Sequence, residues 1–155
     1  MYKNVRFLIV LIVSVTLFSA CEDTHDDDHM DIVGLEIRLD GQAIVTQARN
    51  TQSGQIEVTG TIDVVSGETT PMLTVAFIDP DGDALQITDS DFSIGIIPTN
   101  TALMTINHDA SLARWGFTVQ GKQAGTEVIQ ISLFHGTHAD FESRSITVQV
   151  HSSGD

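Results

Sequence analysis

Apolar and polar residues alternate along most of the chain after Ile32, and this period-two pattern predicts β-strands with one buried face. The alternation is clear in residues 33–39, 42–48, 56–64, 73–77, 92–97, 102–106, 113–119, 129–133 and 146–150. Asp40-Gly41 predicts a hairpin turn between the first two strands, and residues 49–54 form a polar loop after the second. No segment keeps an apolar period of 3.6 residues, so no helix is expected.

Eight or nine short strands with turn residues between them are typical of an all-β sandwich built from antiparallel strands. We therefore interpret residues 32–151 as one domain and residues 152–155 as a tail. Trp115 is the only tryptophan and has the same strand parity as Phe117 and Val119, which favours a place in the core. The alternative for Trp115 is an exposed platform on which a sugar stacks.

Three short motifs near the C-terminus carry a family resemblance. They are Val119-Gln120-Gly121, Ala124-Gly125-Thr126 and the strand Ser145-Ile146-Thr147-Val148-Gln149-Val150. Together they resemble a bacterial immunoglobulin-like domain. The resemblance implies an immunoglobulin-like β-sandwich and a role as a spacer, adhesin module, carbohydrate-binding accessory or surface-layer part. Because one fold serves many functions, such a role is an analogy.

The N-terminus has the layout of a bacterial lipoprotein signal peptide. Lys3 and Arg6 precede an apolar run at 7–18, and Ser19-Ala20 leads to Cys21, the only cysteine. The run is shorter than the roughly 20 apolar residues of a membrane-spanning helix and fits a secretory signal. We expect removal of residues 1–20 and a lipid on Cys21 that anchors the chain to a membrane. The alternative is an ordinary signal peptide with an incidental cysteine.

Acidic residues outnumber basic ones in the chain beyond the signal peptide. Removing residues 1–20 leaves five basic side chains against 21 acidic ones, a net charge of about −16. Such a charge repels phosphate backbones, which excludes nucleic acid as a partner. Residues 21–31 are so rich in Asp that we expect a disordered tether. His25 and His29 within it offer a second interpretation, capture of a transition metal.

The acidic loop 79–91 is the first candidate site in the domain. Asp79, Asp81 and Asp83 alternate with Pro80 and Gly82, a spacing that lets carboxylates converge on calcium when the backbone curls. The string resembles the calcium-binding loops of cadherin-like bacterial domains. The same residues also make a plain turn, since Asp, Pro and Gly each favour one turn position.

The segment 134–141 is the second candidate site, and we expect it to be a loop between the last two strands. His135, His138 and Asp140 supply three potential ligands for zinc or copper, with His108 as a possible fourth. The alternative is structural: the Asp caps backbone donors, the imidazoles bond carbonyls, and Phe134 and Phe141 close the end of the sandwich.

No motif of a nucleophilic, metallohydrolytic or phosphate-binding enzyme occurs in the chain, so we expect no catalysis and no required cofactor. The sequence favours a lipid-anchored binding or structural module of the bacterial cell envelope, with the membrane and a protein or glycan as partners. The alternative is an envelope metal-binding lipoprotein. It would use zinc or copper at 134–141, or calcium at 79–83.

Overall fold

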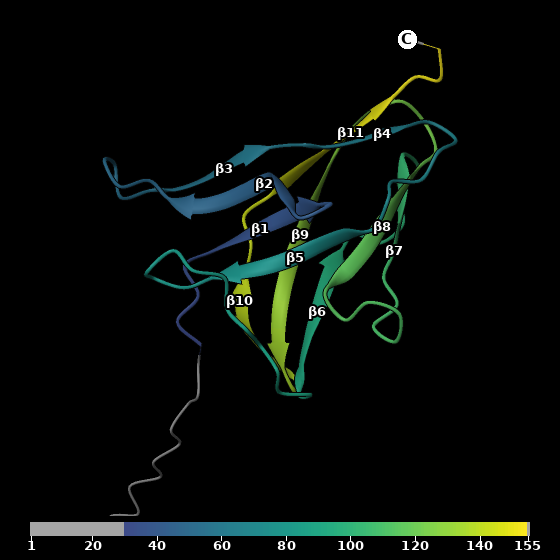
Figure 1. Ribbon diagram of the computed structural model, residues 1–155. Coiled ribbons are helices and arrows are strands. Elements are labelled where there is room, and N and C mark those ends of the chain that lie inside the picture. The colour runs from purple at the N-terminus through teal and green to yellow at the C-terminus, as the bar shows by residue number, and fades with distance from the viewer. Residues whose placement is uncertain (1–29, 155) are drawn as a thin grey trace, which may run out of the picture.

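The computed structural model describes residues 30–154 (Figure 1). The predictions made for Cys21, His25 and His29 lie outside the described residues. Residues 30–154 contain no helix with the length and apolarity needed to cross a bilayer.

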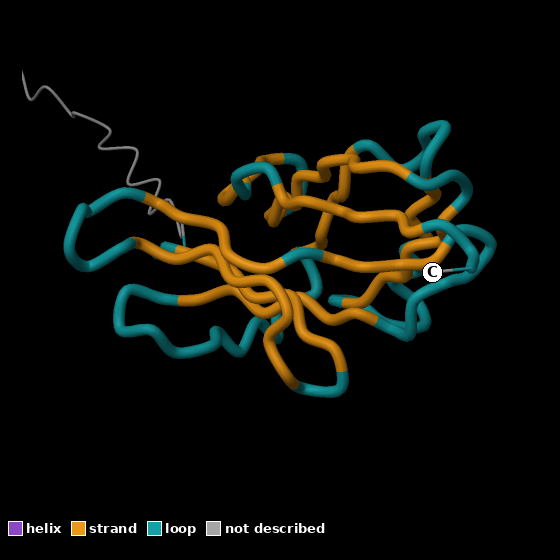
Figure 2. Tube along the Cα trace, turned by 90° about the horizontal axis from the view of Figure 1, so that it is seen from above, coloured by secondary structure: helices purple, strands orange, loops and turns teal. Residues whose placement is uncertain are grey.

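Eleven β-strands in two sheets make up the described part of the chain, which confirms the all-β prediction. The first sheet has the order β3 (Ile56–Gly60), β2 (Gln42–Arg49), β1 (Gly34–Leu39), β5 (Leu73–Ile78), β8 (Gly116–Gly121), β7 (Met104–Asn107). The second has the order β10 (His138–Glu142), β9 (Gly125–His135), β11 (Ile146–His151), β4 (Ile62–Val65), with β6 (Phe92–Ile97) paired to β9. Figure 2 shows the strands from above, with loops joining them at the ends.

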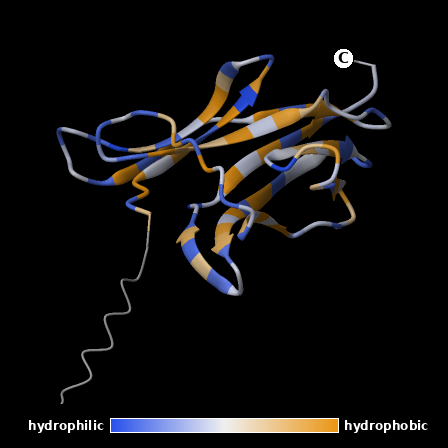
Figure 3. Cartoon of the chain, turned by 60° about the horizontal axis from the view of Figure 1, so that its bottom comes forward, coloured by the Kyte–Doolittle hydropathy of each residue, from blue (hydrophilic) through white to orange (hydrophobic). Residues whose placement is uncertain are grey.

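The core forms between the two sheets from alternate residues of nearly every strand. Along β5 and β11, for example, buried residues alternate with partly or fully exposed ones, as the period-two pattern predicts. Figure 3 shows the matching bands of hydrophobic and hydrophilic residues. The most deeply buried large side chains are Phe77, Phe117, Leu35, Ile37, Ile62, Leu73, Met104, Ile129, Ile131, Leu133 and Ile146. Burial of this apolar surface is the main stabilising term of the fold.

The predicted single strand 56–64 is wrong, because the chain changes sheets at Gly60. Gly60 has a φ of 86°, and a Cβ atom there would lie 2.0 Å from the backbone oxygen of Ile44. Only glycine fits this bend and this close approach. β3 therefore joins the first sheet, while β4 crosses to the second and pairs parallel with β11, in place of the expected purely antiparallel arrangement.

The predicted loop 134–141 is also wrong. β9 continues to His135, and after the two-residue turn Gly136-Thr137 the chain returns as β10. β9 is long enough to pair with β11 through its first half and with β6 and β10 through its second. The number of strands thereby exceeds the expected eight or nine.

Candidate functional site

The acidic loop 79–91 forms a turn built on the Asp79 side chain. Oδ1 of Asp79 accepts hydrogen bonds from the backbone N–H groups of Asp81 at 3.0 Å and Asp83 at 2.9 Å. The backbone oxygen of Asp79 accepts a further bond from Gly82 at 3.1 Å. These contacts match the turn interpretation. Calcium binding by Asp79, Asp81 and Asp83 stays a prediction that these contacts do not require.

The histidines of the second candidate site lie opposite each other on a hairpin. His135 ends β9, His138 begins β10, and the two are cross-strand partners. The His135 ring stacks on Phe92 with centroids 4.3 Å apart, whereas His138 is exposed. Asp140 lies at a β-bulge between Ala139 and Phe141. The hairpin thus makes the two histidines backbone neighbours, and zinc or copper binding there stays a prediction.

No three His, Cys, Asp or Glu side chains are gathered within residues 30–154 in a way that could hold a metal ion. His108, the possible fourth ligand, follows β7, and its Nδ1 lies 2.7 Å from the backbone oxygen of Gly116. A carbonyl only accepts, so this contact places a proton on Nδ1. Phe141 packs edge-to-face on Phe77 at 5.7 Å, which matches the structural role proposed for it.

Arg114 has a structural role that the sequence did not indicate. Its guanidinium donates to the backbone oxygen of Phe92, through Nη2 at 2.6 Å, and to that of Asp89. It also lies 4.6 Å from the ring centroid of Trp115, whose edge-to-face contact with Phe77 spans 6.1 Å. Trp115 is half-buried and packs against the core. Its ring is thus engaged by neighbours, which disfavours the sugar-platform interpretation.

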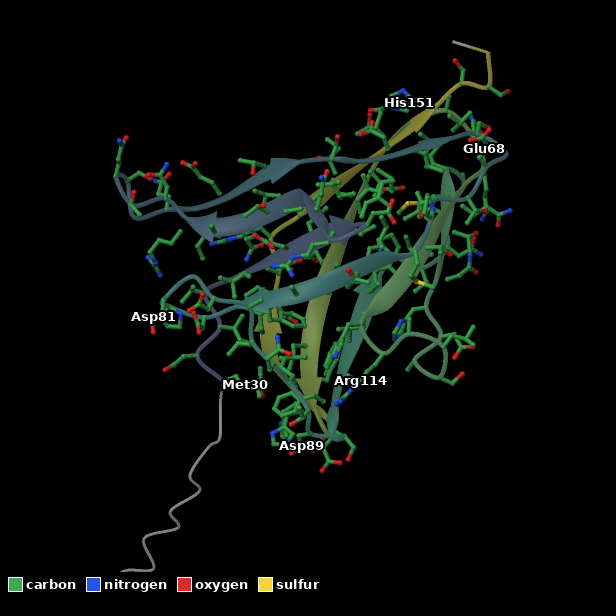
Figure 4. The ribbon with its side chains drawn as sticks, viewed as in Figure 1. Met30, Glu68, Asp81, Asp89, Arg114 and His151 are labelled. Carbon is green, nitrogen blue, oxygen red and sulfur yellow. The ribbon has the colours of Figure 1, made fainter. Side chains whose placement is uncertain are left out.

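An open groove of about 220 Å³ lies beside β4 and is the candidate functional site. Strand ends and the β4–β5 connection position its walls. Its apolar surface comes from Leu39, Ile44, Ile62, Val64, Val65, Pro71 and Leu73. Its charged or ionisable side chains are Asp63, Glu68 and His151. Figure 4 shows Glu68 and His151 at the same end of the molecule.

Asp63 and His151 form the polar rim on one side of this groove. Oδ1 of Asp63 lies 2.7 Å from Nε2 of His151, and Oδ2 accepts a hydrogen bond of 2.9 Å from the Thr61 hydroxyl. The bond to His151, helped by that to Thr61, holds the pKa of the Asp63 carboxyl below its ordinary value of 3.8, against an opposing effect of burial. Asp63 therefore remains an anion through the neutral and mildly acidic range.

Glu68 is the second carboxylate that lines the groove, and it lies in a segment whose backbone is hydrogen-bonded at several points. Gly67 donates to the backbone oxygen of Gly121 at 2.9 Å, and Gly121 donates to that of Glu68 at 3.0 Å. Ser66 donates to the backbone oxygen of His151 at 2.8 Å. These backbone hydrogen bonds fix the position of Glu68, whose exposed carboxylate lies beside the apolar residues of the groove.

Sequence reasoning missed this groove. The alternation Ile62-Asp63-Val64 marks Asp63 as outward-facing, but its partner lies 88 residues away. No local pattern connects β4 with the last residue of β11, because their pairing depends on the change of sheet at Gly60.

Two other hollows on the described part of the chain lack the pair of carboxylates that lines the groove. One, of about 410 Å³, includes Met72, Leu112 and Asp109. Hydrogen bonds from the hydroxyl and amide of Ser111 hold the pKa of Asp109 below its ordinary value. The other, of about 210 Å³ near Trp115, contains Arg38, which pairs with Glu36 at 2.6 Å.

The groove lies far from the point where the described chain begins. Figure 4 places Met30, Asp81 and Asp89 toward one end of the molecule, and Glu68 and His151 at the other. Met30 is packed against the core, so this starting point is fixed relative to the sheets. The acidic loop therefore lies on the Met30 side, and the groove lies on the opposite side.

No family model matches the chain. No curated protein matches it either. Among solved structures, domains 4 and 5 of the S-layer protein SbsC are similar at 12% identity with a TM-score of 0.42, covering 76% of this chain and 75% of that one. A structure of surface layer protein SbsC domains 1–6 is similar at 13% identity with a TM-score of 0.43, covering 72% of this chain and 16% of that one. Neither likeness assigns a function to this chain.

Proposed function

We propose that this chain is a noncatalytic, lipid-anchored module of the bacterial cell envelope that presents a binding surface away from the membrane. The observation that carries the proposal is the separation of the two ends of the sandwich. The described chain begins at Met30, nine residues after Cys21, while Glu68 and His151 lie at the opposite end (Figure 4). A lipid on Cys21 would leave the groove facing outward.

The chain's composition supports the same arrangement. An acidic segment directly after the anchor repels anionic head groups and holds the domain away from the bilayer. A single acyl chain binds a membrane only reversibly, so stable anchoring needs more than one chain. We expect that requirement to be met at Cys21.

Cell fractionation tests the proposal through Cys21→Ser. The unaltered protein is expected in the membrane fraction, with incorporated radiolabelled palmitate. Cys21→Ser loses the palmitate and leaves that fraction. Ser19→Ala is the matched control, because it keeps a small residue before the cleavage position and should behave like the unaltered chain. Membrane association and labelling of Cys21→Ser equal to those of the control would refute the anchor.

Metal capture by the hairpin is the second candidate function. The single observation in its favour is that His135 and His138 are cross-strand partners, since such partners have Cβ atoms about 5 Å apart. Calorimetric titration with zinc and copper, before and after EDTA treatment, tests it. Binding that is lost in His138→Ala would support this function, and no binding tighter than about millimolar would exclude it.

A further inference from the structure

The β4 groove carries negative charge that the described chain does not neutralise with lysine or arginine. Asp63 and Glu68 both line it, and the residues around it include no basic side chain besides His151. Lys122 lies near in sequence to Gly121, which bonds Glu68, but its ammonium is turned to the side chain of Asn100 and the backbone oxygen of Thr101. Within residues 30–154, the Glu68 carboxylate has no ion-pair partner.

The remaining surface of the groove is apolar and small. Seven of its twelve lining residues are Leu, Ile, Val or Pro. A volume of about 220 Å³ is less than the roughly 300 Å³ at which pockets for whole small-molecule ligands begin. The groove thus suits a single long side chain better than a complete cofactor.

An aliphatic stem ending in a positive charge matches both properties. Lysine and arginine lay their methylene groups along apolar surfaces while the charged head reaches polar groups. The partly or fully exposed apolar residues Leu39, Ile44 and Pro71 would contact the stem. The carboxylates of Asp63 and Glu68 would receive the head. Opposite charges on facing surfaces favour encounter and correct orientation.

We propose that the β4 groove binds a lysine or arginine side chain presented by a protein partner. The inference deepens the proposed function, since it rests on the domain being a binding module. A protein source is favoured because β4 is the last strand in the order of the second sheet. An extended segment of a partner can lie along such an edge while one side chain enters the adjacent pocket.

Three matched peptides test this proposal on the purified full chain. The probes are acetyl-Val-X-Val-amide with X as lysine, norleucine or glutamate, and the readout is the shift of backbone amide resonances in NMR titrations. The lysine peptide should shift resonances of β4 and of residues 66–71. Norleucine, which keeps the stem but lacks the charge, should bind more weakly, and glutamate should bind least.

Two single-residue variants test whether the charge that binds the lysine peptide is that of Glu68 in the groove. Glu68→Gln should weaken lysine-peptide binding about two- to fivefold, as expected for one exposed ion pair, and 0.5 M salt should weaken it further. Glu142→Gln removes the same charge from the exposed end of β10 and should leave binding unchanged. Equal weakening by both variants, or equal binding of the three peptides, would overturn the proposal.

Cadaverine, an alkyl diamine, distinguishes the source of the ligand. Binding as tight as that of the lysine peptide would overturn the protein partner, because the peptide backbone would then contribute nothing. These titrations do not depend on lipid attachment. If the lysine peptide does not bind, the fractionation result for Cys21→Ser is unaffected. If Cys21→Ser shows no lipid anchor, the peptide titrations are unaffected.

Discussion

Gln47 of β2 and Arg144, which follows β10, are joined across the sandwich: Oε1 of Gln47 accepts a hydrogen bond of 2.6 Å from the backbone N–H of Arg144. Gln47 is 1% exposed, which makes it one of two buried polar residues among those described. The other is Ser143, whose hydroxyl accepts a bond of 2.8 Å from the backbone N–H of Ile131. Gln47 and Ser143 thus accept hydrogen bonds from two backbone N–H groups, that of Arg144 between β10 and β11 and that of Ile131 in β9.

Replacing Gln47 with leucine should lower the free energy of unfolding by about 0.5–1.5 kcal/mol, because the backbone N–H of Arg144 loses its acceptor. Urea unfolding followed by the fluorescence of Trp115 measures the change. Gln42→Leu, at an exposed position of the same strand, should change stability by less than about 0.5 kcal/mol. A loss at Gln47 no larger than that at Gln42 would show that the inter-sheet bond contributes nothing.

The change of sheet at Gly60 predicts an unusually sensitive position. Gly60→Ala combines a positive φ of 86° with a Cβ atom 2.0 Å from Ile44 O, so we expect a loss of more than about 2 kcal/mol. Gly82→Ala has a similar φ of 91° but open space around its Cβ position, and should cost only about 1 kcal/mol. Thermal unfolding of both variants separates backbone strain from the steric clash. Equal losses of stability would mean that β2 and β3 move apart at Gly60 at little energetic cost, which would contradict the predicted steric clash.

Sequence patterns locate some of these features and miss others. Alternation found the strands around Val75, Phe117 and Val148, because burial of one sheet face needs a period of two. It could not find the break at Gly60, since Ile56, Val58, Ile62 and Val64 keep their parity across it. It also could not find β10, where exposed His138 and partly buried Asp140 interrupt the apolar pattern. The groove was missed because it depends on the pairing of β4 with β11, which are distant in the sequence.

The Asp63–His151 contact predicts a dependence of stability on pH. Because folding lowers the pKa of Asp63 below 3.8, its contribution is complete above about pH 5 and is lost as the pH falls through the folded-state pKa. Both side chains are about half exposed, so the contribution should not exceed about 1 kcal/mol. Unfolding of the unaltered chain and of Asp63→Asn between pH 7 and pH 2.5 measures it. The stability difference should shrink toward pH 2.5, and a constant difference would contradict the assignment.

The turn at Asp79 gives a prediction that also examines calcium. Asp79→Ala removes an acceptor of two backbone N–H groups and should lower stability by about 0.5–1.5 kcal/mol, whether calcium or EDTA is present. Asp81→Ala, at an exposed position of the same turn, should have little effect. Thermal unfolding in both solutions provides the measurement. A stabilisation by calcium that both variants abolish would instead support the calcium prediction.

The proposed function depends above all on a lipid at Cys21 that anchors the sandwich with its groove facing outward. The most direct test is the intact mass of the full chain after purification from the envelope of cells that produce it. We predict a mass equal to that of residues 21–155 plus attached lipid. A mass that retains residues 1–20, or one that begins at Cys21 without lipid, would contradict the proposal.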